Sequence, residues 1–181
     1  KKPLTFRGPK IDRNNDEKLY RLESANKFLQ PFLEKSHMPY GPSHAPYEYF
    51  LSKIKQKKLD KDDLKGKFIG NKRGIVWCTW EKSVKEAEKD KNTLDDLRDR
   101  LGLSHFYEGM ETIQLVYDQK VINGLEKGLR CPTIMDAGSN PYFLPGGRAM
   151  SLSSKEGLPE MIHEKIPMDS IDIKCRGKLT R

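Results

Sequence analysis

The segment of sequence that most constrains the fold reads GLPEMIHEKIPMDSI over residues 157–171. It contains two short runs of mostly apolar residues, with a polar turn between them. The first run directly follows Glu160, and the second extends from Ile166 to Ile171. Apolar runs this short, bounded by Gly and Pro, are typical of strands. We therefore expect a short strand that begins at Glu160 and places this carboxylate at its mouth.

Working outward, the hydrophobic periodicity predicts helices first and short strands later. Four helices are expected. The first carries Leu19 to Phe32 and follows an N-cap at residues 14–16, and the second begins at Pro46. The other two cover residues 82–100 and 121–125. The expected strands cover residues 3–8, 74–80, 112–117 and 148–153, and residues 131–147 are expected to be irregular. This order favours an α+β fold, with N-terminal helices and a small, mostly antiparallel split sheet. A single domain over residues 1–181 is expected, with a frayed basic tail at 172–181.

Composition and charge point to anionic partners. The chain carries 34 Lys and Arg against 26 Asp and Glu, a formal net charge of +8. Such a surface favours nucleic acid, a phosphate-bearing ligand or an acidic protein face, although interspersed acidic residues also fit a plain solvated surface. The lysine-rich segment 53–67 and the basic tail favour one alternative, a nucleic-acid-binding module without catalysis. Another alternative is a protein-interaction domain that uses the Pro- and Tyr-rich loop 36–49.

Several classes of function are disfavoured by what the sequence lacks. Cys78, Cys131 and Cys175 are far apart and form no CxxC pair, so neither a zinc site nor a disulfide framework is indicated. A reducing, intracellular site of action follows, with delivery from another cell left open. No apolar run is long enough to span a membrane, and no Gly-rich nucleotide-binding motif is present. Because the chain begins at Lys1, we expect an excised domain of an unidentified parent protein.

A few side chains are candidates for a functional site. Arg7 followed by Gly8 offers a guanidinium fork to a phosphate with close access to the backbone, or is a surface Arg beside a turn. Glu160 either stabilises a developing cation or is a turn residue paired with nearby lysines. Thr79 either caps the helix that follows it or contacts a ligand. Two serines ahead of Glu160, Ser151 and Ser153, either line a site by hydrogen bonding or form a turn.

Two weaker patterns complete the candidates. The histidines and tyrosines of loop 36–49, Tyr49 among them, suit stacking on a base or a nicotinamide ring, whereas their spacing does not suit a metal. Gly146-Gly147-Arg148 suits anion binding through backbone N–H groups. A Cys–His nucleophile built on Cys78 or Cys131 is not selected by any spacing.

Together these elements resemble the ADP-ribosyltransferase-like fold. The resemblance rests on two segments. Leu4-Thr5-Phe6-Arg7-Gly8 looks like the first strand, and Pro159-Glu160-Met161-Ile162 followed by residues 166–171 looks like the last element. The chain departs from the family pattern in two ways. Ser151-Leu152-Ser153 lies too close to the glutamate to be the family's Ser-Thr-Ser strand, and Leu158 stands where some members carry Glu or Gln.

The resemblance implies an NAD-cleaving domain of the kind found in toxins and effectors. NAD would be the co-substrate, held by Arg7, while Glu160 stabilises the ribosyl cation. Tyr49 or Tyr107 would stack on nicotinamide, and Gly8, Thr79, Ser151 and Ser153 would line the site. The acceptor would be a protein or a nucleic acid, and no metal is implied.

Overall fold

The computed structural model describes residues 17–33, 45–71, 73–89, 94–125, 127–137, 143 and 146–180. The expected strand at 3–8 and the N-cap at 14–16 lie outside these residues, as does most of loop 36–49. All structural statements below concern the described ranges.

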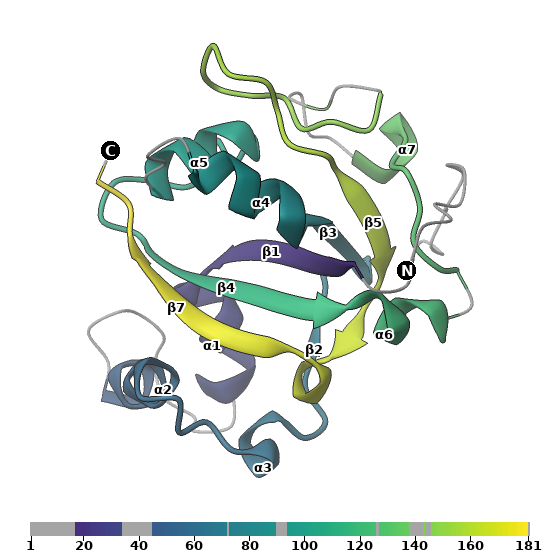
Figure 1. Cartoon of the computed structure of the whole chain (residues 1–181). Helices are drawn as coiled ribbons and strands as arrows, with labels where there is room; N and C mark the ends of the chain where they lie inside the picture. Colours follow the sequence, from purple (N-terminus) through teal and green to yellow (C-terminus); the bar gives the residue numbers. More distant parts are fainter. Residues whose placement is uncertain are drawn as a thin grey trace.

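A five-stranded antiparallel sheet with the strand order β5-β3-β1-β4-β7 forms the centre of the molecule (Figure 1). Its strands are β1 (Lys18–Ser24), β3 (Ile75–Trp80), β4 (Glu111–Asp118), β5 (Met161–Glu164) and β7 (Asp172–Lys178). A smaller sheet pairs β2 (Phe68–Ile69) with β6 (Ile166–Pro167). The helices and the antiparallel sheet confirm the α+β class.

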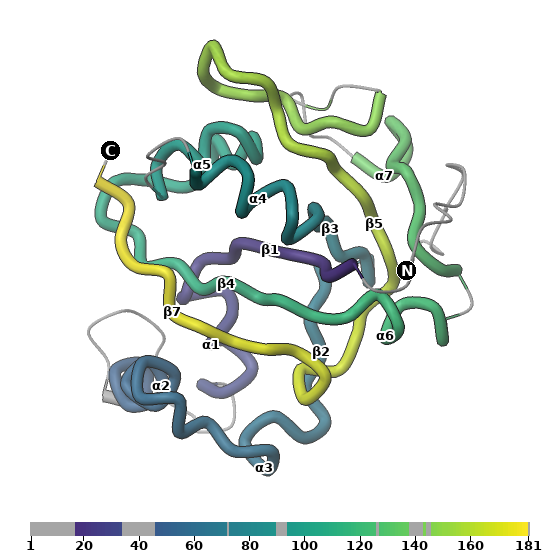
Figure 2. Tube along the Cα trace, viewed as in Figure 1, coloured from purple at the N-terminus to yellow at the C-terminus, as the bar shows by residue number. Residues whose placement is uncertain are grey.

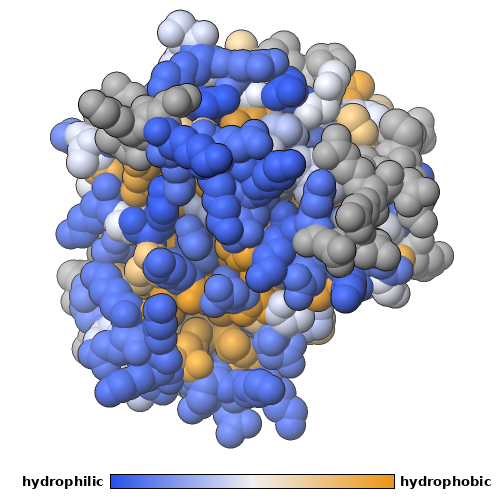
Figure 3. All heavy atoms as spheres, in the orientation of Figure 1, coloured by the Kyte–Doolittle hydropathy of each residue, from blue (hydrophilic) through white to orange (hydrophobic). Residues whose placement is uncertain are grey.

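Helices cover both faces of this sheet. The helices α1 (Ala25–Leu33) and α2 (Ala45–Lys55) lie below it in Figure 1, and α4 (Glu81–Glu88) and α5 (Leu94–Arg100) lie above it. Shorter elements complete the described chain: α3 (Lys61–Leu64), α6 (Gln119–Asn123), α7 (Ile134–Ala137) and the 3₁₀ turn η2 (Met168–Ser170). Hydrophilic side chains cover the outer face of α4 and α5 (Figure 3). Both helices are highly charged and have few apolar residues, and these face the sheet, so most of the polar residues face outward.

Two separate cores hold the layers together. One packs α1 and α2 against β3 and β4, with Phe28, Leu51 and Leu115 among its members. The other packs α4 and α5 on the opposite face, with Tyr20, Val84 and Leu97 among its members. Burial of apolar area on both faces drives this layered arrangement.

The structure corrects the prediction of a helix through residues 19–32. Residues Lys18–Ser24 form β1, and only Ala25–Leu33 are helical. β1 is flanked by β3 and β4 and has helices on both faces, so Leu19, Tyr20 and Leu22 are all buried. A strand buried on both faces loses the alternating pattern that identifies strands, and here its apolar residues fell at helical spacing.

Three further predictions were wrong in detail. The 82–100 segment is two helices, α4 and α5, rather than one. Residues 148–153 make no strand, since only an isolated bridge between Arg148 and Pro159 forms there. The expected frayed tail is β7, which pairs with β4 along its length (Figure 2). Backbone hydrogen bonds to a neighbouring strand stabilise this segment despite its many lysines and arginines.

Candidate active site

The central sheet splits between β1 and β3. These strands pair only at Leu19 with Trp80 and at Tyr20 with Thr79. Beyond that point β1 continues beside β4 as far as Ser24, and β3 continues beside β5. The two halves of the sheet therefore separate, as expected for a split sheet, and leave the rest of β1 without a partner on its β3 side.

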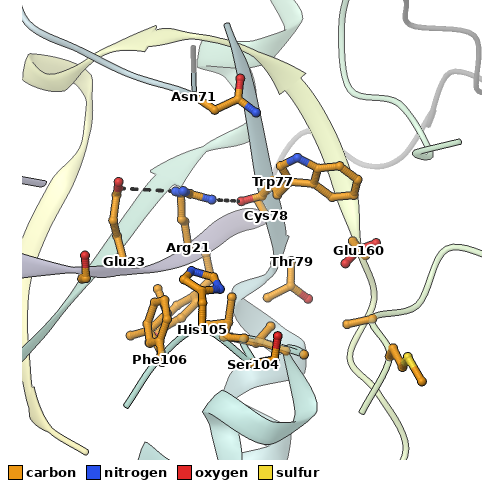
Figure 4. Close-up of a pocket in the computed structure, with 18 of the residues that line it drawn as sticks. Arg21, Glu23, Asn71, Trp77, Cys78, Thr79, Ser104, His105, Phe106 and Glu160 are labelled. Carbon is orange, nitrogen blue, oxygen red and sulfur yellow. Dashed lines mark hydrogen bonds and ion pairs between the residues drawn. The ribbon is translucent and has the colours of Figure 1, made fainter. Parts of the chain in front are cut away.

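A cleft of about 460 Å³ occupies this split (Figure 4). That volume lies within the usual range for small-molecule sites. Its walls come from β1, β3, the loop after α5 and the segment ahead of β5. The lining residues are Tyr20–Ser24, Lys27, Asn71, Ile75, Trp77–Thr79, Leu101–Phe106, Phe143, Ala149, Met150, Pro159 and Glu160.

Arg21 lies at the cationic end of the cleft. Its Nη1 donates to the carbonyl of Trp77 at 2.9 Å, so the guanidinium crosses the split from β1 to β3. Its Nε faces Glu23 Oε2 at 3.4 Å. Lys27 and His105 line the same end, and although both are largely exposed, desolvation and the charge of Arg21 lower the pKa of each. The mutual repulsion of these groups favours a bound anion.

Glu160 lies at the other end, across β3 from Arg21 (Figure 4). Its backbone N–H donates to the carbonyl of Gly147 at 2.8 Å, and the preceding Pro159 is bridged to Arg148. A close approach fixes this segment further, because a Cβ on Gly157 would lie 1.8 Å from the carbonyl oxygen of Ala149. The glutamate is therefore held in place by its backbone, and none of the described residues bonds to its carboxylate.

The carboxylate of Glu160 is poorly solvated and lacks an ion-pair partner among the described residues. Burial raises its pKa from 4.5 to about 7. A buried carboxylate without a partner costs folding free energy, so a strongly raised pKa in a cleft marks a candidate functional group. The alternative expectation, a turn residue paired with lysines, does not describe this side chain.

Thr79 and two aromatic rings lie near Glu160. The hydroxyl of Thr79 is buried and has no hydrogen-bond partner among the described residues. Helix α4 begins after Trp80, without a side-chain cap, so the predicted capping role of Thr79 is wrong. Trp77 and Phe143 are in edge-to-face contact at 6.2 Å, and both line the cleft. These two aromatic side chains suit contact with a flat ring.

A second hollow of about 500 Å³ lies on the other side of the Glu160 segment. We call it the outer hollow. Its lining residues are Trp80, Ser83, Cys131, Gly146, Gly147, Arg148, Pro159, Glu160 and Met161. Pro159 and Glu160 line both cavities, so Glu160 lies where the two meet.

Among the predicted site residues that the structure describes, Glu160 and Thr79 line the cleft, and Glu160 also lines the outer hollow together with Gly146-Gly147-Arg148. Arg7 and Gly8 lie outside the described residues. Tyr49 is on α2 and is 57% exposed, Tyr107 is 55% exposed, and neither lines the cleft. Ser151 and Ser153 bond to each other in an exposed turn, which is the alternative role expected for them.

Sequence reasoning missed Arg21, Lys27, Trp77, His105 and Phe143. One available signal was the charged Arg21 within an apolar stretch, Leu19-Tyr20-Arg21-Leu22. The helix predicted across this stretch concealed it, because a charge on one face of a helix is unremarkable.

Cys78 and His163 are not placed to act as a nucleophile, and no metal site is found among the described residues. Burial raises the pKa of the Cys78 thiol to about 12, so it remains protonated at neutral pH. His163 is fully buried and accepts from Tyr117 Oη at Nε2, while Nδ1 donates to the carbonyl of Glu164. Within the described ranges, no group of three or more His, Cys, Asp or Glu is placed to hold a metal ion.

No family model, curated protein or solved structure matches this chain. Among the described helices, none has the length and apolar character needed to cross a membrane. The function is therefore argued from the cleft itself.

Proposed function

We propose that this protein is an NAD-dependent ADP-ribosyltransferase or NAD-cleaving domain. The observation that carries the proposal is the split-sheet cleft, which has a cationic end at Arg21 and an isolated carboxylate, Glu160, at the other. NAD has the matching polarity, with an anionic diphosphate at some distance from a cationic nicotinamide ring.

In this proposal Arg21 takes the phosphate-binding role first expected of Arg7. A guanidinium fork binds phosphate oxygens through two parallel hydrogen bonds, and Lys27 adds charge at the same end. Arg21 contacts Glu23 and the Trp77 carbonyl, which hold its side chain across the split. The diphosphate would take over the contact that Glu23 now makes.

Nicotinamide would lie at the other end, between the aromatic rings and Glu160. Trp77 and Phe143 replace Tyr49 and Tyr107 as the residues proposed to contact its face, whereas the Thr79 hydroxyl is buried and takes no part in this contact. Cleavage of the glycosidic bond develops positive charge on the ribose, and a fixed carboxylate stabilises that charge without reorganisation. Nicotinamide leaves as a neutral molecule.

The raised pKa of Glu160 fits this role. With a pKa of about 7, the carboxyl of the protein alone would be about half protonated near pH 7. A cationic ring bound beside it favours the ionised form, so NAD binding would lower the pKa and release a proton. Ionisation would thus be linked to the presence of the substrate.

Nicotinamide release from NAD at pH 8 tests the proposal. Glu160→Gln should lower the rate by about 100-fold or more, as is typical for loss of a charge-stabilising group. Glu156→Gln removes a carboxylate in the same segment whose side chain is 70% exposed, and serves as the matched control. Unchanged nicotinamide release by a folded Glu160→Gln variant would eliminate the proposed role.

The alternative, a basic nucleic-acid-binding module without catalysis, receives no specific support from the lysine-rich segment. Lys53 pairs with Asp63 at 3.1 Å, and Lys55 pairs with Glu111 at 3.3 Å. These pairs reduce the local positive charge. Absence of nicotinamide release, together with salt-sensitive retention on nucleic acid, would favour this alternative.

A further inference from the structure

Glu160 lines two cavities, and a transfer reaction has two substrates, NAD and an acceptor, that could each bind in one of them. If NAD fills the cleft, as the proposed function requires, its reacting ribose carbon lies near Glu160. A nucleophile must then reach that carbon from outside the cleft. Glu160 also lines the outer hollow, so a second molecule bound there would lie beside the same residue.

The side chains of the outer hollow favour an anionic nucleophile. Arg148 is its cation, and Glu160 is the one carboxylate among the described residues that line it. A guanidinium acceptor would face Arg148 without a second carboxylate to compensate its charge. An anionic oxygen, in contrast, is attracted by Arg148 and attacks without a general base.

Backbone donors lie beside Arg148. Gly146 and Gly147 have φ angles of +115° and +77°, which glycine adopts readily. Both line the outer hollow, and no hydrogen bond to another described residue occupies their N–H groups. A backbone N–H group beside an Arg can add to the hydrogen bonds that its guanidinium makes to a tetrahedral anion.

Arg148 is available to a ligand. Its Nε pairs with Glu156 at 3.3 Å, with side chains 52% and 70% exposed, and its Nη1 donates to the carbonyl of Gly157 at 3.0 Å. An ion pair this exposed is weak, so a phosphate can displace Glu156 while the bond to Gly157 keeps the guanidinium in place.

We propose that the outer hollow binds the acceptor and that the acceptor is a terminal phosphate of a nucleic-acid strand. A phosphate monoester carries close to two negative charges and several strong acceptor oxygens, and the net charge of +8 attracts the strand that bears it. A phosphate oxygen forms a bond to the ribose carbon as the carbon–nitrogen bond to nicotinamide breaks. The electron pair of the broken bond goes to the nicotinamide nitrogen, and the dianionic phosphate gives up no proton.

The test uses this chain with NAD labelled in its adenylate phosphate. One reaction contains a single-stranded oligonucleotide with phosphate at both ends, and the other contains the same strand with hydroxyl ends. Labelled strand and released nicotinamide are measured together. The expected result is label on the phosphorylated strand alone.

Variants locate the acceptor. Arg148→Ala should lower labelled strand per nicotinamide released by about tenfold, as expected for loss of a charge-assisted contact. Ser83→Phe, which fills the outer hollow from α4, should have the same effect without removing a charge. Lys155→Ala is the matched control, because Lys155 is also about half exposed and pairs with Asp96 at 3.3 Å. It should leave the ratio unchanged.

Three kinds of result separate the possible failures. Nicotinamide release without a labelled strand, or equal labelling of the hydroxyl-ended strand, overturns the acceptor assignment and leaves the NAD proposal standing. A lack of nicotinamide release with either strand overturns the proposed function and this inference with it. Label on an added acidic protein instead of the strand would make the acceptor a protein carboxylate and also overturn the inference.

Discussion

Replacing Glu160 by Gln should stabilise the fold at neutral and alkaline pH while it removes activity. In the folded protein the carboxyl has a pKa of about 7, against 4.5 when solvated. The folded state therefore holds its proton more tightly than the unfolded state does. Stability that is present below pH 4.5 is lost as the pH rises through 7, because the carboxylate then ionises in a poorly solvated site.

The magnitude follows from the shift. Each pKa unit corresponds to about 1.4 kcal/mol, so the full shift costs the wild type about 3 kcal/mol above pH 8. The glutamine side chain is neutral at every pH and has nearly the same shape. Glu160→Gln should thus exceed the wild type by about 3 kcal/mol in free energy of unfolding at pH 8, and by little at pH 4.5.

Urea unfolding of both proteins at several pH values measures this gap. Other titrating groups contribute equally to both proteins, so the difference isolates Glu160. Glu156→Gln, whose side chain is exposed, should show no such pH-dependent gap. A gap that stays constant from pH 4.5 to pH 8 would refute the claim that burial raises the pKa of Glu160.

Four further outcomes are expected. Arg21→Lys should raise the KM for NAD about tenfold in steady-state kinetics, because the ammonium cannot bind phosphate in a bidentate fashion; an unchanged KM would remove Arg21 from the phosphate site. Thr79→Val should raise the Tm in thermal unfolding, since it replaces a buried hydroxyl that has no described partner by a methyl group of the same shape, and a drop in Tm would contradict this. Gly157→Ala should destabilise the fold by about 3 kcal/mol in urea, because its methyl group would collide with the Ala149 carbonyl; near-native stability would show that the approach is looser. Burial lowers the pKa of His163 from 6.5 to about 4, so stability that is present above pH 6.5 should be lost as the pH falls toward 4. In His163→Gln, the free energy of unfolding should lose about 3 kcal/mol less over this pH range.

Much of the fold could be predicted from the sequence, because several segments carry an unambiguous local pattern. The strands at 74–80 and 112–117 and the helix after Pro46 were predicted close to their observed bounds, β3, β4 and α2. The strand directly after Glu160 was also predicted, since Gly and Pro bound its short apolar run. β3 and β4 are buried on both faces, and each is a short run of mostly apolar and β-branched residues that is recognisable without alternation. Strong turn residues mark the starts of the other two elements.

Where local pattern conflicted with tertiary context, prediction failed. β1 resembled a helix because its neighbours bury both of its faces, and β7 resembled a frayed tail because its pairing partner, β4, lies far away in sequence. Pairing between distant segments leaves no local trace, so neither element could be assigned with certainty from its own residues.

The sequence by itself determined the α+β class and singled out Glu160 as an isolated carboxylate at the mouth of a strand. Only the tertiary structure decided what stands opposite Glu160. It placed Arg21 at the far end of the cleft, left Tyr49 and Tyr107 outside, and set Glu160 between two cavities. The physical reason is that the cleft exists only where β1 and β3 stop pairing with each other. Beyond that point β1 pairs with β4 and β3 pairs with β5, and these pairings between distant segments form only in the folded chain.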